Sequence, residues 1–382
     1  MSGLLQKPFY AIELKVNQVE SLDKALTSII DDCTECGNCV DQCSYLQRFG
    51  TPSVLAKQFQ TGALEPEVIY SCSLCKLCDV FCPEKLEISH LFWLMRVNMV
   101  EEGRASLRQH RRILAYEKWG LSKFFQLTTI PANSTTIFFP GCALAGSRPR
   151  QMLQICDLLR QEIADLGIVL SCCAKPSHDL GRTEFFNQSF NKLMRNLKEH
   201  TVTSIITACP SCHQIFKEYA QGFDVKTIYE VLAGKPQLVK PDQPATIAIH
   251  DPCSTRFETK VHQSVRSIAV SMGCTITEMK HSRKRTFCCG EGGSACFIAP
   301  DITDQWAEKR AGQTKGKPIL TYCAGCVQFL SGKFDTIHLI DLLLSPEKAL
   351  SGKTKVSRTP FTYINRLLLK RKLRFYDTFW GI

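Results

Sequence analysis

Residues 287–293 read FCCGEGG, and the adjacent cysteines in this stretch, Cys288 and Cys289, raise the question that decides the fold. A second adjacent pair, Cys172 and Cys173, lies in the stretch SCCAKP. Neighbouring thiols are poor disulfide partners because the small ring that would join them is strained. Two thiols on a tight bend can instead face one metal centre, so the other cysteines of the chain become informative.

The cysteines around these pairs recur in the same order twice along the chain. Each set contains one cysteine, then the adjacent pair, then a C-x-x-C. The two sets are Cys142, Cys172, Cys173, Cys209 and Cys212, and Cys253, Cys288, Cys289, Cys323 and Cys326. The β-rich run at 136–146 matches that at 246–256, and 204–212 matches 318–326, so the repeat extends beyond the cysteines.

Short β-rich runs alternate with helical stretches in both copies, which predicts a parallel sheet in each. Ligands of such sheets gather beyond the carboxyl ends of the strands, and the repeated cysteines lie at those ends. We therefore expect an α+β multidomain protein with two α/β domains related by internal duplication. Each domain is expected to gather its five cysteines at one site.

A different cysteine pattern lies nearer the N-terminus. Residues 33–43 read CTECGNCVDQC and residues 72–82 read CSLCKLCDVFC, so both runs are C-x2-C-x2-C-x3-C, the spacing of two-cluster ferredoxins. Three closely spaced thiolates wrap three corners of a cubane, and the fourth ligates the other cluster. The expected ligand sets are Cys33, Cys36, Cys39 and Cys82 for one [4Fe–4S] cluster, and Cys72, Cys75, Cys78 and Cys43 for the other. Zinc is the alternative, but zinc usually takes four ligands in two pairs.

These patterns divide the chain into four segments. The segment between the two ferredoxin-like runs contains two stretches with Pro near a first helical turn, so the ferredoxin domain is expected to be helical. The expected domains are a helical dicluster ferredoxin at 1–130, a first cysteine-repeat domain at 131–240, a second at 241–350, and a basic amphipathic tail at 351–382.

The composition indicates a reducing compartment. The chain has 21 cysteines in 382 residues, too long for a secreted disulfide scaffold, and its first ten residues lack the apolar core of a secretory signal. No apolar run approaches the ~18 residues that span a bilayer. We expect a cytoplasmic protein, peripheral to the inner face of the membrane.

The net charge of +11 is concentrated in the tail. Residues 351–382 carry eight Lys/Arg against one acid, Asp377, and mix these charges with Leu and aromatic residues. Such a segment can lie on an anionic membrane surface, dock on a redox partner, or form an exposed basic helix. Among the cysteines outside the patterns, Cys156 and Cys274 are expected to be buried apolar residues, and the role of Cys296 is open.

A dicluster ferredoxin followed by two such cysteine repeats resembles the iron–sulfur family that contains the catalytic iron–sulfur subunit of heterodisulfide reductase, whose repeats are called CCG domains. It is also similar to the iron–sulfur subunits of anaerobic glycerol-3-phosphate dehydrogenase and glycolate oxidase. The resemblance covers about residues 30–345. It implies that each complete CCG motif holds a noncubane [4Fe–4S] cluster on five cysteines, and that a substrate disulfide is reduced there one electron at a time.

The first copy departs from the motif, because Ala174 stands where the motif has Gly. The second copy is thus the better candidate for the catalytic cluster, on Cys253, Cys288, Cys289, Cys323 and Cys326. The first copy would bind a cofactor on Cys142, Cys172, Cys173, Cys209 and Cys212. The resemblance implies two cubane clusters and one or two noncubane clusters.

The expected function is an iron–sulfur oxidoreductase subunit that passes electrons through the cubanes to or from the CCG clusters, which act on a thiol/disulfide or a redox partner. The alternative is a non-catalytic relay for a flavoprotein dehydrogenase that oxidises glycerol 3-phosphate, lactate or glycolate and feeds quinone. The expected partner is a flavoprotein or a membrane cytochrome/quinone module. A nucleic-acid partner is not expected.

Two further features keep two interpretations each, and a third has one. His250 and Asp251 precede a ligand, so they either transfer a proton to a leaving thiolate or orient the loop. The basic stretch at 280–285 either attracts an anionic substrate or is simply solvated. The glycines at 290–293 lack the context of a nucleotide fingerprint, and instead let the backbone approach the cluster.

Overall fold

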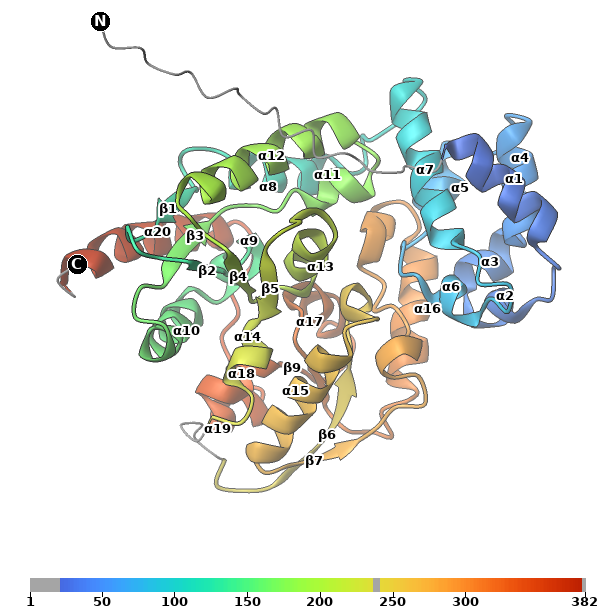
Figure 1. Cartoon of the computed structure of the whole chain (residues 1–382). Helices are drawn as coiled ribbons and strands as arrows, with labels where there is room; N and C mark the ends of the chain where they lie inside the picture. The colour runs from blue at the N-terminus through green and yellow to red at the C-terminus, as the bar shows by residue number, and fades with distance from the viewer. Residues whose placement is uncertain (1–20, 236–240, 380–382) are drawn as a thin grey trace, which may run out of the picture.

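The computed structural model describes residues 21–235 and 241–379, with side chains up to residue 374. A helical unit, drawn in blue in Figure 1, lies beside two α/β units, each built around its own sheet. The architecture is therefore mixed α/β with an N-terminal helical part. The last three residues and the first twenty lie outside the described residues.

The helical unit is built from short helices whose starts are encoded locally. Ser21 and Thr51 cap two of them by accepting hydrogen bonds from the backbone of the first turn, and Pro52 opens the second. In each ferredoxin-like run a left-handed residue, Gly37 or Lys76, turns the cysteine loop into a short helix. The helices are α1 (Leu22–Asp32), α2 (Asn38–Gln42), α3 (Ser44–Phe49), α4 (Pro52–Gln60), α5 (Pro66–Tyr70), α6 (Leu77–Phe81) and α7 (Ile88–Glu101), and the next helix, α8 (Arg111–Gly120), lies on the first α/β unit in contact with α11.

The first α/β unit contains a five-stranded sheet in the order β1-β3-β2-β4-β5, parallel except for the antiparallel edge strand β1. This edge strand begins at Leu127, ahead of the boundary expected at residue 131. The elements are β1 (Leu127–Thr129), β2 (Thr136–Phe139), α9 (Cys142–Ser147), α10 (Pro149–Glu162), β3 (Gly167–Leu170), α11 (Lys175–Asp179), α12 (Thr183–Glu199), β4 (Ser204–Thr207), α13 (Pro210–Tyr219), β5 (Asp224–Thr227) and α14 (Ile228–Leu232).

The second α/β unit contains a four-stranded parallel sheet in the order β7-β6-β8-β9, the order that β3-β2-β4-β5 has in the first. The loops of this unit contain three 3₁₀ turns, η1 (Cys253–Thr255), η2 (Arg283–Arg285) and η3 (Gly292–Phe297). The other elements are β6 (Ala245–His250), α15 (Thr259–Ser271), β7 (Cys274–Thr277), α16 (Pro300–Ala311), β8 (Ile319–Thr321), α17 (Ala324–Leu330), β9 (Thr336–His338), α18 (Leu339–Leu344) and α19 (Pro346–Leu350).

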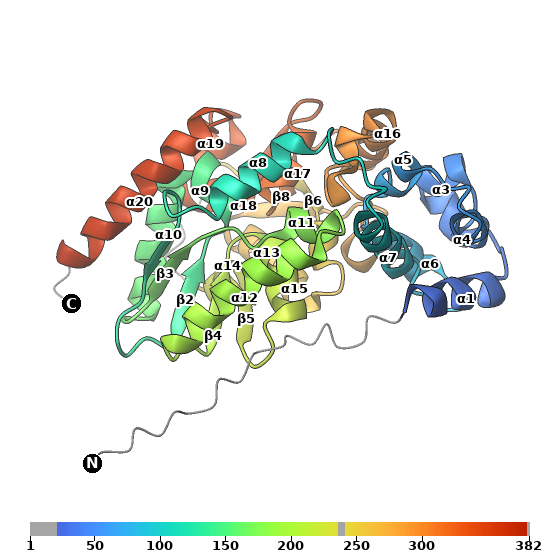
Figure 2. The ribbon, with the colours of Figure 1, turned by 90° about the horizontal axis from the view of Figure 1, so that it is seen from above.

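The C-terminal segment is a helix that packs on the first α/β unit. Figure 2 shows α20 (Phe361–Phe379) lying along α9 and α10, with which it is in contact. Leu369 and Leu373 on one face of α20 are buried in the apolar core that the two α/β units share. Residues 361–374 therefore pack against the rest of the protein, because the segment has an apolar face of Leu residues in addition to its Lys and Arg residues.

Arg96 of α7 joins the three units at one point. Its side chain is fully buried, and its guanidinium donates hydrogen bonds to the backbone carbonyls of Cys72, Asp179 and Gly293. These carbonyls belong to the second ferredoxin-like loop, the first α/β unit and the second α/β unit. The same guanidinium also bonds the carbonyls of Ile69 and Tyr70.

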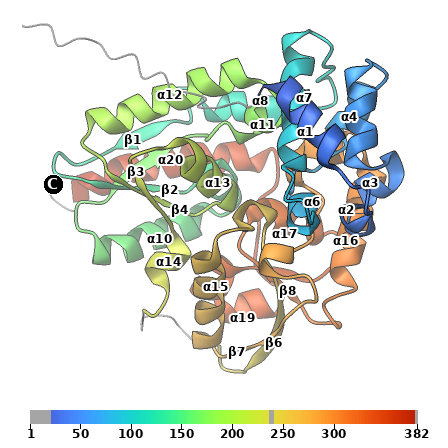
Figure 3. The ribbon, with the colours of Figure 1, turned by 45° about the vertical axis from the view of Figure 1, so that its right-hand side comes forward.

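The chain passes very close to this residue. A Cβ on Gly181 would come within 2.4 Å of the backbone carbonyl of Arg96, so only glycine fits there. Trp93, on the same helix, donates a hydrogen bond to the carbonyl oxygen of His178 at 2.8 Å and stacks on its ring. The helical unit also lies beside the second α/β unit, as Figure 3 shows. There α3 of the helical unit contacts α16 of the second α/β unit.

Replacing Arg96 by Met should lower the free energy of unfolding by about 3 kcal/mol, because several buried carbonyls lose their only charged donor. Thermal denaturation of the anaerobically purified protein measures the change. The control is Arg48→Met, which breaks a pair with Asp301 whose side chains are 52% and 58% exposed and which should change stability little. Equal denaturation temperatures for both variants would contradict the role given to Arg96.

Candidate metal centres

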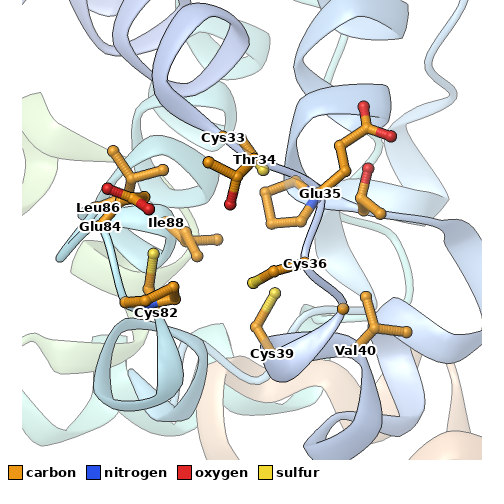
Figure 4. A pocket seen from close by; sticks show the side chains of 14 residues that line it. Cys33, Thr34, Glu35, Cys36, Cys39, Val40, Cys82, Glu84, Leu86 and Ile88 are labelled. Carbon is orange, nitrogen blue, oxygen red and sulfur yellow. The ribbon is translucent and has the colours of Figure 1, made fainter.

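The first ferredoxin-like cavity gathers four thiols from two distant loops. Cys33, Cys36 and Cys39 line it together with Cys82, which follows α6, and Figure 4 shows their side chains around one space. Burial and the neighbouring Cys33 raise the pKa of the Cys39 thiol to about 11. Cys36 is exposed, so this cavity is the one of the two that lies near the surface.

The second cavity is buried, and it is lined by one cysteine of the first run and three of the second. Cys43 from the first run joins Cys72, Cys75 and Cys78 from the second, and the apolar rings of the lining include Trp306. Burial, followed by the charges of Cys75 and Cys72, holds the pKa of Cys43 well above its usual range. Crowded thiols in a dry cavity match a cationic metal cluster, which keeps such groups as thiolates.

The two repeated cysteine sets form two similar chains of thiols. Within each chain, hydrogen-bonded sulfurs follow one another from the isolated cysteine through the adjacent pair to the C-x-x-C. The sequences are Cys142, Cys172, Cys173, Cys212 and Cys209, and Cys253, Cys288, Cys289, Cys326 and Cys323. All ten thiols are free and none is exposed.

The second cysteine of each adjacent pair has a lowered pKa, and in the first site the contact with Cys212 lowers the pKa of Cys209 as well. Hydrogen bonds from Cys172 and Cys212 lower the pKa of Cys173 to about 6, and bonds from Cys288 and Cys326 do the same for Cys289. The sites are therefore congruent in their thiol contacts. Both lie at the carboxyl ends of their parallel strands, where the topology rule places ligands.

The second repeated site touches the buried ferredoxin-like cavity directly. The thiols of Cys75 and Cys288 are in contact, and this contact raises the pKa of Cys75 well above its usual range. A Cβ on Gly292 would lie 2.8 Å from the carbonyl oxygen of Ser73 and 3.3 Å from the sulfur of Cys288. Gly292 and Gly293 thus let the backbone reach the loop of this cavity, in line with the close backbone approach that the sequence predicts. The Nε of Arg256 donates to the carbonyl of Cys75 at 2.8 Å and holds the two loops together.

The turns after the two adjacent pairs differ in what they tolerate. Ala174 has a φ of 57°, a left-handed conformation in which its Cβ is accommodated. Gly290 has a φ of 108°, and a Cβ there would lie 2.4 Å from the ring of Phe329 and 2.6 Å from the carbonyl of Thr303. The alanine therefore fits the first site, whereas the second requires glycine.

His250 and Asp251 have separate roles in the second site. Both carboxylate oxygens of Asp251 accept hydrogen bonds from Arg266, and the backbone of Arg283 and the hydroxyl of Tyr322 donate as well. This saturated carboxylate holds its loop in place, the second of the two interpretations. His250 instead has a ring nitrogen within 4.8 Å of the sulfurs of Cys289 and Cys326.

Two charged side chains near the repeated sites were not indicated by any cysteine pattern. Arg366 of α20 is 3% exposed and lies against the first site, where a Cβ on Gly120 would be 3.0 Å from its Nη2 and 3.2 Å from the Cβ of Cys172. Its guanidinium stacks on Tyr116 and Phe125. Lys175 is the other, and it pairs with Asp179 at 2.8 Å. A cation beside a Leu-rich run is the sequence signal that could have marked Arg366, whereas Lys175, in the stretch KPSHD, has no such signal.

The remaining cysteines divide as their sequence contexts indicate. Cys156 and Cys274 are buried among the apolar residues of the largest core cluster. Cys296 lies in η3, and burial, followed by the charges of Glu291 and Cys289, raises its pKa to about 12. Cys296 therefore neighbours the second site without joining the chain of hydrogen-bonded thiols.

Family models match the chain at these same segments. A 4Fe-4S dicluster domain model matches residues 32–87, and the model of the cysteine-rich CCG domain matches twice, at 136–217 and 247–331. Together they cover more than half of the chain. The chain belongs to the CCG iron–sulfur family of heterodisulfide reductase. It is thus an iron–sulfur protein with one dicluster domain and two CCG domains.

The similar proteins come from archaea and bacteria. An uncharacterized iron–sulfur protein of Methanocaldococcus jannaschii is 25% identical over 68% of this chain and 56% of its own length. An EtfAB:quinone oxidoreductase of Syntrophomonas wolfei is 22% identical over 69% of this chain and 43% of its own. One of the subunits of the dihydromethanophenazine:CoB–CoM heterodisulfide reductase of Methanosarcina barkeri is 22% identical over 82% of this chain and 92% of its own.

The chain spans little more than half the length of the first of these relatives and less than half of the second. Within residues 21–235 and 241–379, no helix has the length and apolar character needed to cross a bilayer.

A cavity of about 1270 Å³ lies between the two CCG domains. Ala143, next to Cys142, borders it from the first domain, and Glu291 and Gly325 border it from the second. Its basic side chains are Arg112, Arg148, Lys333 and Arg358. The basic stretch at 280–285 is engaged elsewhere, since Arg283 pairs with Glu278 and Lys284 lies over Phe257.

The two turns give a matched pair of variants. Gly290→Ala should remove about four iron atoms per chain, the content of one cluster, because the added Cβ meets a ring and a backbone carbonyl that cannot both move. Ala174→Gly should keep its iron and change stability by less than about 1 kcal/mol. Iron analysis of anaerobically purified protein measures both. Full iron content in Gly290→Ala would show that the second turn is not constrained as described.

Proposed function

We propose that the chain is the electron-transfer subunit of a redox complex in which two cubane clusters connect an external partner with a noncubane cluster at the second CCG site. The observation that carries this proposal is the contact between Cys75 and Cys288. It puts the buried ferredoxin-like cavity against the second CCG site. The proposed order is the surface cavity with Cys36, then the buried cavity, then the second CCG site.

The clusters would supply one-electron chemistry at each position. The chain's own residues determine where they lie and what surrounds them. Arg96 and Arg256 bond the carbonyls of Cys72 and Cys75, which holds the buried cavity against the CCG loop. The exposed Cys36 marks the end at which a partner, such as a flavoprotein or a membrane cytochrome/quinone module, would exchange electrons.

We further propose that a thiol or disulfide reacts at the second CCG site from the cavity between the CCG domains. Gly325 lies between Cys323 and Cys326 and borders this cavity, with the carboxylate of Glu291 packed against it, so the site is one residue away from the cavity wall. Arg148 is paired with Asp341 and Lys333 with Asp304, so Arg112 and Arg358 are the basic residues of the lining that would attract an anionic substrate. The relative from Methanosarcina is named for a heterodisulfide reductase, which supports this substrate class.

The first CCG site is proposed to hold a second noncubane cluster. Its five thiols have the same contacts as those of the second site, and Ala174 adopts the left-handed turn. Two matches of one domain model and the shared strand order support an origin of both domains by internal duplication. The domain limits 131–240 and 241–350 and all ligand assignments remain predictions.

A relay for a quinone-linked dehydrogenase is the second candidate function, and one surface favours it. We define the α20 face as the exposed apolar residues Phe361, Ile364, Leu367 and Leu368 together with Trp119 and Phe124. The exposed Arg371, Lys372 and Arg374 follow on the same helix. An apolar strip with basic neighbours fits an anionic membrane surface, and one relative is named a quinone oxidoreductase. This face supports the expected peripheral location at the inner face of the membrane.

Iron content tests the number of clusters. Anaerobically prepared protein should contain about 16 iron atoms per chain if all four sites hold a [4Fe–4S] cluster, and about 8 if only the cubanes are present. Cys289→Ser should lower the content by about four, and Cys156→Ser, at a buried cysteine of the core, should not. A count near 8 in the unmodified protein would rule out a disulfide-reducing CCG cluster.

Electron paramagnetic resonance tests the substrate class. Adding an anionic disulfide to the reduced protein should produce a new paramagnetic signal, because the substrate would take electrons singly at the second CCG site. Cys289→Ser should lose the signal and Cys156→Ser should keep it. A protein with full iron that shows no change with disulfide, but passes electrons to a quinone, would favour the relay.

Vesicle flotation tests the α20 face. The protein should float with vesicles that contain anionic lipid and less with purely zwitterionic ones. Leu367→Asp should reduce flotation about tenfold, because it puts an acid into the apolar strip. The control is Val270→Asp, which alters an apolar side chain on α15 that is 60% exposed and should have no effect. Equal flotation of both variants would show that the membrane is not bound through α20.

A further inference from the structure

The two CCG sites share five thiols but differ in a sixth position. β6 ends at His250 and β2 ends at Phe139, and each of these residues precedes the first cysteine of its site by three positions. The two strands occupy the same place in their sheets. An imidazole therefore stands in the second site where a benzyl ring stands in the first.

The ring of His250 is held at one nitrogen. The Nε of Arg310 donates a hydrogen bond to Nδ1 of His250 at 2.8 Å, and both side chains are fully buried. Because a guanidinium has no acceptor, Nδ1 must be the acceptor in this pair. The neutral ring consequently carries its proton on Nε2.

The other nitrogen has no partner among the described residues. Nε2 of His250 is buried and makes no hydrogen bond, although buried polar groups are nearly always paired. A ring nitrogen of His250 and the sulfurs of Cys289 and Cys326 all lie within 4.8 Å of one another. With Nδ1 bound to Arg310, the free Nε2–H is the group available to the space that these sulfurs enclose.

The first site has no such donor at the corresponding place. Phe139 is fully buried in the apolar cluster that contains Cys173, Cys209 and Cys212. Its ring packs edge-on against Phe216, with 4.9 Å between the centroids. The two sites therefore differ in polarity at a strand residue, His250 or Phe139, and not only in their loops.

We propose that His250 is a sixth element of the second CCG site, an N–H donor to the sulfur of its cluster that Arg310 orients and that the first site lacks. This inference rests on the proposed presence of a cluster at the second site. Direct ligation of iron by Nε2 is disfavoured, because it would move the ring proton to Nδ1, where Arg310 already donates. Hydrogen bonds to cluster sulfur stabilise the reduced, more negative form. His250 thus raises the reduction potential of the second cluster.

The test is a redox titration of the whole protein, followed by electron paramagnetic resonance, on two variants of one residue. His250→Phe copies the first site and should shift the potential of the second cluster to a more negative value, with iron content unchanged. His250→Gln keeps an acceptor for Arg310 and an N–H near the place of Nε2, and should keep the potential close to that of the unmodified protein. The control is His338→Phe, at another buried histidine whose Nε2 has no partner, and it should leave the potential unchanged.

Labelling the histidines with ¹⁵N gives an independent readout. The cluster signal should show a weak nitrogen coupling that disappears in His250→Phe. A strong coupling typical of iron-bound nitrogen, or no coupling at all, would overturn the proposal. So would an unchanged potential in His250→Phe with full iron, and that result would leave the proposed function intact. Unmodified protein that holds iron only for the cubanes would instead overturn both.

Discussion

The contact between the three units of this structure depends on one buried guanidinium. Arg96 sits where the dicluster loop, the first CCG domain and the second CCG domain meet, and it bonds a backbone carbonyl from each. A buried charge is costly unless its donors are satisfied, so the three backbones must approach in one arrangement. Because they do, the loop of Cys72 and Cys75 lies directly against the loop of Cys288.

Two glycines show that the backbones of neighbouring units approach closely. Gly181 has no room for a Cβ beside the Arg96 backbone, and Gly292 has none beside Ser73. Close approach of backbones shortens the path between thiol clusters. The molecule therefore places glycine where two units touch, and uses arginine to supply the donors that the touching carbonyls need.

The two CCG domains are alike in topology and thiol contacts but not in their surroundings. The first is covered by α20, whose Arg366 lies beside Cys172, and it borders the α20 face through the end of α8. The second faces the buried cavity of the dicluster domain and has His250 in place of Phe139. The repeated five-cysteine set thus forms two similar CCG sites, and the residues around each site make the two different.

The cysteine spacing alone determined most of the chemistry. Thiols two residues apart must follow a tight loop, and a parallel sheet must bring its strand ends together, so the pattern predicted the four groups of cysteines and the mixed α/β class. Only the tertiary structure decided which groups are neighbours, that residues 361–374 cover the first CCG site, and that a cavity separates the two CCG domains. These features depend on contacts such as Arg96 with Gly293 and Arg310 with His250. Sequence patterns are local, and they do not report which distant loops will share a buried charge.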